Sequence, residues 1–250
     1  MLQALLFTAI SVLVSCVGLF LFQKFIAAEK IERNNESTGI YFGVITILYS
    51  LILAFSITSV WDDYEEINAN VAREAQKLAD IYSYSNQLQA SAKVELKTAV
   101  RNYTIAVIDD IEKGNTKARA QIAHESFIEL RRLVLQNDTS LTDGSRGSLR
   151  ENYYELRNLR NKRLATNHSH VPMLLWWALI IGSVLCVFIS WFIQVPSLKT
   201  HLIFTAAMSA IIAFMLFIGY ALDHPFEGAA KISCDPLQEL LDEQFKIADS

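Results

Sequence analysis

The sequence predicts an all-α membrane protein with four transmembrane helices in two pairs and a helical extramembrane domain inserted between spans two and three. Three observations lead to this prediction. Of the 250 residues, 52% are hydrophobic, whereas an ordinary soluble domain is about 45–50% apolar. The excess is concentrated in four runs that contain no Asp, Glu, Lys or Arg. A polar stretch without proline separates the second run from the third.

The four apolar runs cover residues 4–22, 40–61, 171–195 and 202–222. A helix of about 20 apolar residues crosses the ~30 Å hydrocarbon core of a bilayer. Because no water is available there, each backbone group must be paired within the protein, so runs of this length are expected to be helices. We therefore predict a multi-pass protein whose first partner is a lipid bilayer.

The first run also resembles a cleaved signal, because Leu13-Val14-Ser15-Cys16 looks like a lipoprotein cleavage box. However, no Lys or Arg precedes this run, and the run continues beyond the cysteine to Phe22. A cleavage site would be expected to end the apolar stretch. We therefore expect the first run to be retained as a span.

The insert, residues 62–170, has apolar residues at helical spacing and is predicted to be helical. These residues are Ile67, Val71, Leu78 and Tyr82, then Val100, Tyr103, Val107 and Ile111, then Ile122, Phe127, Leu130 and Leu133, and finally Leu149, Tyr153 and Leu156. No Gly or Pro occurs from residue 62 to residue 88. The second span is therefore expected to continue as one helix from about residue 40 to residue 88.

Composition and motifs argue against several classes of function. The insert holds 16 basic and 16 acidic residues, which is not the basic surface that binds nucleic acid. The three cysteines, Cys16, Cys186 and Cys234, form no metal-binding pattern, so we expect no metal and no cofactor. Of these, only Cys234, in the acidic tail 223–250, is expected to meet solvent. Without a phosphate loop, nucleophile elbow or HExxH motif, we expect no enzymatic activity.

Span two is the polar span. Five of its residues share one helical face: Thr46, Tyr49, Ser50, Leu53 and Ile57. In a symmetric oligomer this face is a candidate ion pathway, in which hydroxyl groups bind water while Leu53 and Ile57 narrow the conduit. Alternatively, the hydroxyl groups bond to the backbone or to neighbouring helices, as in many membrane bundles. Both interpretations stay open.

Four carboxylates follow span two within five residues: Asp62, Asp63, Glu65 and Glu66. If span two lines a pathway, each subunit contributes them to a ring at the pore mouth, which concentrates cations and repels anions. The alternative is a solvated helix face at the point where a continuous helix leaves the membrane. Neither the spacing nor the central glycine of a calcium-binding loop is present.

The fourth span ends in Asp223-His224-Pro225-Phe226. Pro225 cannot continue a helix and restricts the residue before it to an extended backbone, so helix termination is the first interpretation. Asp223 is also a candidate partner for a basic side chain. His224 titrates near neutral pH in its ordinary form, which makes Asp223 and His224 a possible gating pair.

Three stretches resemble the mainly bacterial bestrophin-like domain family. They are NNESTGIYFGVITILYSLILAFSITSVWDDYEEINANVAREAQKLADIY, PMLLWWALIIG and TAAMSAIIAFMLFIGYALDHPFEG, in this order over nearly the whole chain. The resemblance implies a relation to bestrophins, which are pentameric ion channels with paired spans around a helical cytosolic part. It implies a homo-oligomer, a pentamer by analogy alone, and we expect a bacterial inner membrane.

The side of the membrane that the insert faces stays open. The loop 24–38 holds three basic residues and the loop between spans three and four holds Lys199, so the positive-inside rule places the insert outside. The basic residues Arg157, Arg160, Lys162 and Arg163, just before span three, argue for the opposite side. The resemblance to bestrophins also implies a cytosolic insert.

Two hypotheses about function follow. The first is a homo-oligomeric, bestrophin-like ion channel or pore with span two along the pathway and an acidic mouth. The second is a membrane-anchored scaffold or sensor whose helical insert binds a partner protein.

Overall fold

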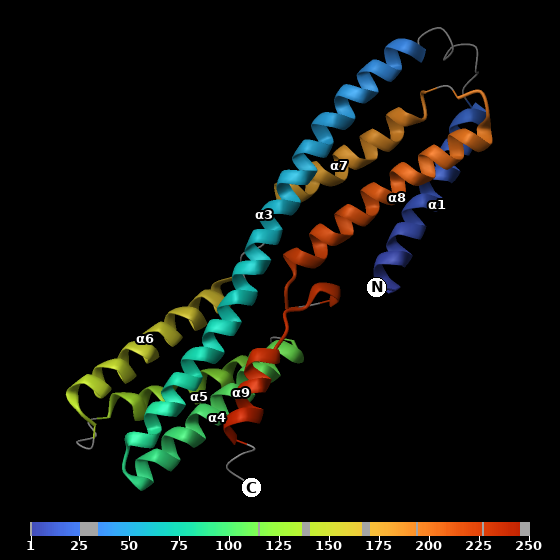
Figure 1. Ribbon diagram of the computed structural model, residues 1–250. Coiled ribbons are helices and arrows are strands. Elements are labelled where there is room, and N and C mark those ends of the chain that lie inside the picture. The colour runs from blue at the N-terminus through green and yellow to red at the C-terminus, as the bar shows by residue number, and fades with distance from the viewer. Residues whose placement is uncertain are drawn as a thin grey trace. The chain divides into compact units, whose positions relative to one another are not determined.

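The computed structural model describes residues 2–25, 35–114, 116–136, 141–166, 171–193, 195–226 and 228–245. Within these ranges the regular structure is entirely helical, which confirms the predicted all-α fold class (Figure 1). The α-helices are α1 (Leu2–Phe25), α3 (Asn35–Tyr84), α4 (Ala90–Glu112), α5 (Lys117–Leu135), α6 (Asp143–Thr166), α7 (Met173–Ser190), α8 (Leu198–Asp223) and α9 (Asp235–Phe245). Two short 3-10 helices cover Ser85–Gln87 and Gly228–Ala230. Most of the loop 24–38 lies outside the described residues.

The chain divides into two compact units. The membrane unit comprises Met1–Asp63 and Val171–His224, and the extramembrane unit comprises Tyr64–His170 and Pro225–Ser250. Among the described residues, four helices are long and apolar enough to cross a membrane: α1, α3, α7 and α8. All four contribute to the membrane unit. The chain is therefore a multi-pass membrane protein with the four predicted spans.

In the membrane unit, α8 lies beside α1 and also contacts α7 (Figure 1). The small buried core joins the first part of α3 to α7 through Tyr49, Leu53, Leu179 and Cys186. Large apolar side chains are exposed on all four helices; Phe55, for example, is 68% exposed. Such a surface is stable in lipid, where exposing apolar side chains has no hydrophobic cost.

Helix α3 is a single helix of 50 residues, so the prediction of one continuous helix through the acidic cluster is confirmed. It ends at Tyr84, slightly before the predicted residue 88, and the 3-10 turn Ser85–Gln87 follows. The hydroxyl group of Ser85 donates a hydrogen bond to the carbonyl oxygen of Tyr82. This local bond competes with helical pairing and favours termination here.

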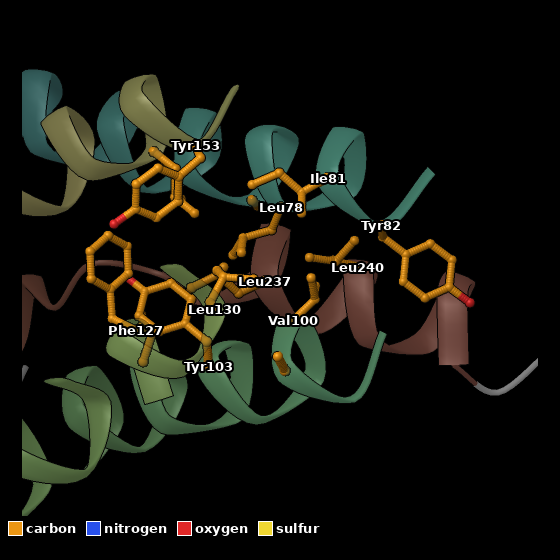
Figure 2. Packing of buried hydrophobic residues seen from close by; sticks show 14 of the residues in the cluster. Leu78, Ile81, Tyr82, Val100, Tyr103, Phe127, Leu130, Tyr153, Leu237 and Leu240 are labelled. Atoms are coloured by element: carbon orange, nitrogen blue, oxygen red, sulfur yellow. The ribbon is translucent and has the colours of Figure 1, made fainter. Parts of the chain in front are cut away.

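The core of the extramembrane unit contains buried side chains from α3, α4, α5, α6 and α9 (Figure 2). The predicted apolar positions on α3, α4 and α6 are buried, as are Phe127 and Leu130 on α5. Leu133 is partly buried against the core. Ile122 is the exception, because its side chain is 56% exposed. Ile122 directly precedes the buried Ala123, and adjacent helical residues point about 100° apart, so its side chain lies beside the buried face and lines the groove between α4 and α5.

The acidic tail folds into α9, which contributes the fully buried Leu237 and the buried Leu240 to this core (Figure 2). The tail is held further by the Tyr82 hydroxyl, which donates to the carbonyl oxygen of Gln244 at 2.7 Å. The expectation that Cys234 meets solvent is wrong, since its side chain is only 5% exposed. Packing of the apolar face of α9 brings the residue before the helix into the core.

Candidate ion pathway and charged clusters

The predicted pathway residues on α3 are divided between a buried and an exposed side of the helix. Tyr49 is 7% exposed, and its hydroxyl group donates to the carbonyl oxygen of Leu179 on α7 at 3.2 Å. Its ring lies against Gly182, where an added Cβ would be 2.6 Å from the ring. Leu53 is 8% exposed and packs in the same core with Leu179 and Cys186. Both side chains therefore contact α7 of the same chain.

The other three predicted pathway residues differ in exposure. Ile57 is half-buried against the core of the membrane unit, and Thr46 is half-buried. Ser50 is exposed, and its hydroxyl group donates to the carbonyl oxygen of Ile47 at 2.9 Å. Thus Ser50 is the one member of the predicted pathway set whose side chain is exposed on the single chain.

A different face of α3 combines exposure with polarity. Ser50, Ala54 and Thr58 are exposed and follow one another at intervals of four residues, so they lie on one side of the helix. Asp62 continues the same spacing and is exposed as well. We call Ser50, Ala54, Thr58 and Asp62 the exposed polar stripe of α3. The sequence pattern shows which residues share a face, but it does not distinguish this stripe from the neighbouring face that packs on α7.

The four carboxylates of the predicted mouth are all exposed on α3. Glu66 forms an ion pair with Lys162 on α6, with 3.2 Å between the carboxylate oxygen Oε1 and Nζ. The hydrogen bond and the charge of Lys162 hold the pKa of Glu66 below its ordinary value. The exposure of Asp62, Asp63 and Glu65 fits both a charged mouth and a solvated helix face, so the ring stays a prediction.

Asp223, at the end of α8, is hydrogen-bonded to the start of the α7 segment. Its Oδ1 accepts from the backbone N–H of Val171 at 2.9 Å, and its Oδ2 accepts from the indole N–H of Trp176 at 3.0 Å. The side chain is only 7% exposed. The carboxylate thus satisfies one backbone donor just before α7 and the indole donor of Trp176, and a negative charge near a helix start is also favourable for the helix dipole. This geometry gives Asp223 a role in joining α8 to α7.

His224 follows as the first residue after α8. Its ring stacks on Tyr220, with 4.3 Å between ring centroids, and Nδ1 is 3.0 Å from the carbonyl oxygen of the same residue. A carbonyl only accepts, so Nδ1 carries the proton in this bond. These contacts fix the ring beside the end of α8, and the gating role of Asp223 and His224 stays a prediction.

Sequence reasoning missed a buried histidine in the membrane unit. His201 on α8 is 3% exposed. Its Nδ1 is 3.1 Å from Nε2 of Gln23 on α1, and its Nε2 is 3.1 Å from the carbonyl oxygen of Ser190 at the end of α7. One side chain thereby connects three helices. The available signal was an ionisable residue at the start of an apolar span, where such residues are rare and usually have a partner.

Sequence reasoning also missed a buried charge cluster in the extramembrane unit, formed by Glu74, Tyr103, Asp110 and Arg163. Glu74 is fully buried, and Arg163 is 4% exposed. Arg163 donates through Nε to Glu74 Oε2 at 2.9 Å, and the hydroxyl group of Tyr103 donates to Glu74 Oε1 at 2.6 Å. Burial, together with the adjacent Glu74 carboxylate, raises the pKa of Tyr103 well above its ordinary value. The signal was the position of Glu74, which falls on the apolar face between Val71 and Leu78.

Across the part of the chain that the structure describes, no three His, Cys, Asp or Glu side chains are grouped so that they could hold a metal ion.

Both the sequence and the fold are similar to those of known proteins. The sequence model of the bestrophin-like domain matches residues 9–237. A structure of the bacterial bestrophin homologue from Klebsiella pneumoniae superimposes with a TM-score of 0.76 at 12% identity, covering 98% of both chains. A single-substitution variant of that homologue gives a TM-score of 0.76 at 13% identity, with 99% of this chain and 100% of that chain covered. No curated protein matches the sequence. At this identity the structural likeness establishes the fold.

Proposed function

The chain belongs to the bestrophin-like family, and from this membership we propose that it forms a homo-oligomeric ion channel in which α3 lines the pathway. Several copies are required, because within one chain the face of α3 that holds Tyr49 and Leu53 is packed, whereas its polar stripe is exposed. A cyclic arrangement of copies encloses such a stripe around an axis. The pentamer expected by analogy is one such arrangement.

The observation that carries the proposal is the exposed polar stripe of α3. Ser50 and Thr58 are exposed on a segment of α3 whose other exposed side chains are mainly apolar, and the Ser50 hydroxyl group donates to the carbonyl oxygen of Ile47 in the same helix. A hydroxyl oxygen keeps acceptor capacity even when its proton is bonded to the helix, and water satisfies this capacity whereas lipid does not. Tyr49 and Leu53 are buried against α7, so in this proposal they support the pathway wall from behind and the stripe forms its lining.

The charge of the proposed mouth favours cations. Asp62 continues the polar stripe, and Asp63 and Glu65 are exposed beside it on α3. A ring of such carboxylates, repeated in each copy, raises the local concentration of cations and repels anions. Glu66 contributes less, because Lys162 compensates its charge.

The test is ion flux from liposomes that contain the purified protein, under separate potassium and chloride gradients. We expect flux that favours potassium. Combined neutralisation by Asp62→Asn, Asp63→Asn and Glu65→Gln should reduce the potassium flux by about tenfold, since steering by charge changes rates by ~10–1,000-fold. Glu129→Gln is the matched control, because Glu129 is exposed on α5 in the extramembrane unit and should leave the flux unchanged.

A second candidate function, a scaffold that binds a partner protein, is favoured by a groove between α4 and α5. A cavity of about 310 Å³ lies there, and Ile105 and Ile122 on its walls are 43% and 56% exposed. Exposed apolar side chains around a hollow are typical of protein-binding surfaces. Absence of ion flux from well-folded, oligomeric protein would contradict the channel and leave this function.

A further inference from the structure

The buried charge cluster holds two carboxylates and one guanidinium that is engaged mainly by one of them. Arg163 on α6 donates through Nε and Nη2 to the two oxygens of Glu74 on α3, at 2.9 and 3.4 Å. Tyr103 on α4 adds a third hydrogen bond to the same carboxylate. Glu74 is thus well supplied with donors, as a buried carboxylate requires.

Asp110 on α4 lacks such donors. Its side chain is 5% exposed, and its Oδ2 is 3.7 Å from Nη1 of Arg163, which is too long for a hydrogen bond. Its Oδ1 is buried and has no hydrogen-bond partner among the described residues. A buried carboxylate oxygen without a donor is costly, because the loss of hydration is not compensated.

The other charged groups around Asp110 direct their donors elsewhere. Arg119 on α5 donates to the carbonyl oxygens of Lys113 and Gly114 at 2.6 and 3.0 Å. Arg160 on α6 lies over the ring of Phe127, at 4.6 Å from its centroid, and contacts Nδ1 of His124 at 3.3 Å. Both arginines act on Asp110 through their charge, without a direct bond.

The segment before α9 contributes Cys234, which lies within range of the charges of Arg163 and Glu112. Burial raises the pKa of this thiol to about 11, so it carries no charge at neutral pH. Arg163 is thus the positively charged residue that forms ion pairs with both Glu74 and Asp110. With both carboxylates ionised, Glu74, Asp110 and Arg163 together carry one excess negative charge.

We propose that Asp110 is a proton-binding site through which the extramembrane unit senses pH. Uptake of one proton by its carboxylate gives a cluster without net charge, in which Arg163 and Glu74 form a matched pair. The protonated carboxyl group also has an O–H that can donate a hydrogen bond. Because the cluster joins α3, α4 and α6, its protonation state sets how firmly these three helices are held together.

The direction of the response follows from linkage. Burial, opposed in part by the charges of the three arginines, raises the pKa of Asp110 above its ordinary value. A group with a raised pKa in the folded state adds stability that is fully present at low pH and is lost as pH rises through the folded-state pKa. For this group, acidification stabilises the extramembrane unit and alkalinisation weakens it.

The experiment is infrared difference spectroscopy on the full-length protein in liposomes, between about pH 8 and about pH 5, where an ordinary Asp side chain with a pKa of about 3.9 stays ionised. We expect a band of a protonated carboxylic acid at the lower pH, which shifts when aspartate is labelled with ¹³C. The band should be lost in Asp110→Asn. It should persist in Asp109→Asn, the matched control, because Asp109 is exposed and paired with Lys113.

Two outcomes would overturn the proposal: absence of a label-sensitive band in the wild-type protein, or a band that persists in Asp110→Asn. The wild-type measurement with the label decides the first point even if the variant does not fold. As a second readout, Asp110→Asn should raise the melting temperature of the extramembrane unit at about pH 8 by ~2–4 °C. The infrared measurement detects proton uptake and does not require ion flux. Its result is therefore independent of the proposed channel activity.

Discussion

At the scale of single residues, the packing of α3 on α7 depends on the absence of a side chain at Gly182. The Tyr49 ring lies so close to this backbone that an added Cβ would be 2.6 Å from it. The ring is also held at its other end by the hydrogen bond from its hydroxyl group to Leu179. The ring therefore has little freedom to move away from a larger residue at position 182.

Gly182→Ala is expected to destabilise the membrane unit by about 1–3 kcal/mol, the usual cost of an overpacked site. Thermal unfolding in detergent, followed by tryptophan fluorescence, measures this effect, because all four Trp belong to the membrane unit. Gly43→Ala on α3 is the matched control, since an added Cβ there meets nothing within 4 Å. An equal effect of both substitutions would contradict the assigned packing of Tyr49.

At the scale of the helices, α9 is the part of the extramembrane unit that comes from the far end of the chain. Leu237 is fully buried and packs in the same core as Leu78 and Val100 (Figure 2). Lys231 and Gln238 contact Glu112 at the end of α4, the latter at 2.6 Å. The C-terminal segment therefore completes the core that the insert begins.

Leu237→Ala is expected to lower the free energy of unfolding of the extramembrane unit by about 2–5 kcal/mol, because the surrounding side chains relax only partly into the cavity that it leaves. Urea unfolding followed by amide hydrogen exchange in α3 and α4 provides the measurement. Glu239→Ala, on the exposed side of α9, should change the stability by less than about 0.5 kcal/mol. Unchanged exchange in α3 and α4 of Leu237→Ala would show that α9 does not complete this core.

The helices were predictable from the sequence because their signals are local. A charge-free run of the right length predicts a span, and the lack of Gly and Pro after Asp62 predicts the continuous α3. Placement of α9 was not predictable, because an 11-residue helix with few apolar residues does not indicate what it packs against. Ile122 shows the same limit, since helical periodicity identifies a face and tertiary contacts decide whether that face is buried.

The candidate site was predictable only in part, for a related reason. The polarity of α3 and its acidic cluster are visible in the sequence. The choice between two adjacent faces depends on Tyr49 and its contact with Gly182, which lies 133 residues further along the chain. Glu74 and Arg163 are likewise brought together by folding alone, so two ordinary charged residues of a balanced insert become a buried pair.

At the scale of the whole molecule, the central claim is that several copies of the chain enclose an ion pathway lined by the exposed polar stripe of α3. Substitutions on two neighbouring faces of this helix are expected to have different effects. Leu53 packs with α7 inside one chain, so substitutions there should change stability, whereas substitutions at the exposed Ala54 are predicted to change the proposed pathway. Variants at these two adjacent residues therefore test the packing of α3 and its proposed conducting role separately.

The most direct measurement is potassium flux through Ala54→Phe in liposomes, with the melting temperature and oligomeric state measured on the same preparation. Ala54 is exposed on the single chain, so the larger ring should leave folding unchanged, and several copies of it should obstruct the pathway. We expect flux to fall by at least about tenfold, as steric and dewetting constrictions close pores. Wild-type flux through a folded, oligomeric Ala54→Phe protein would contradict the account.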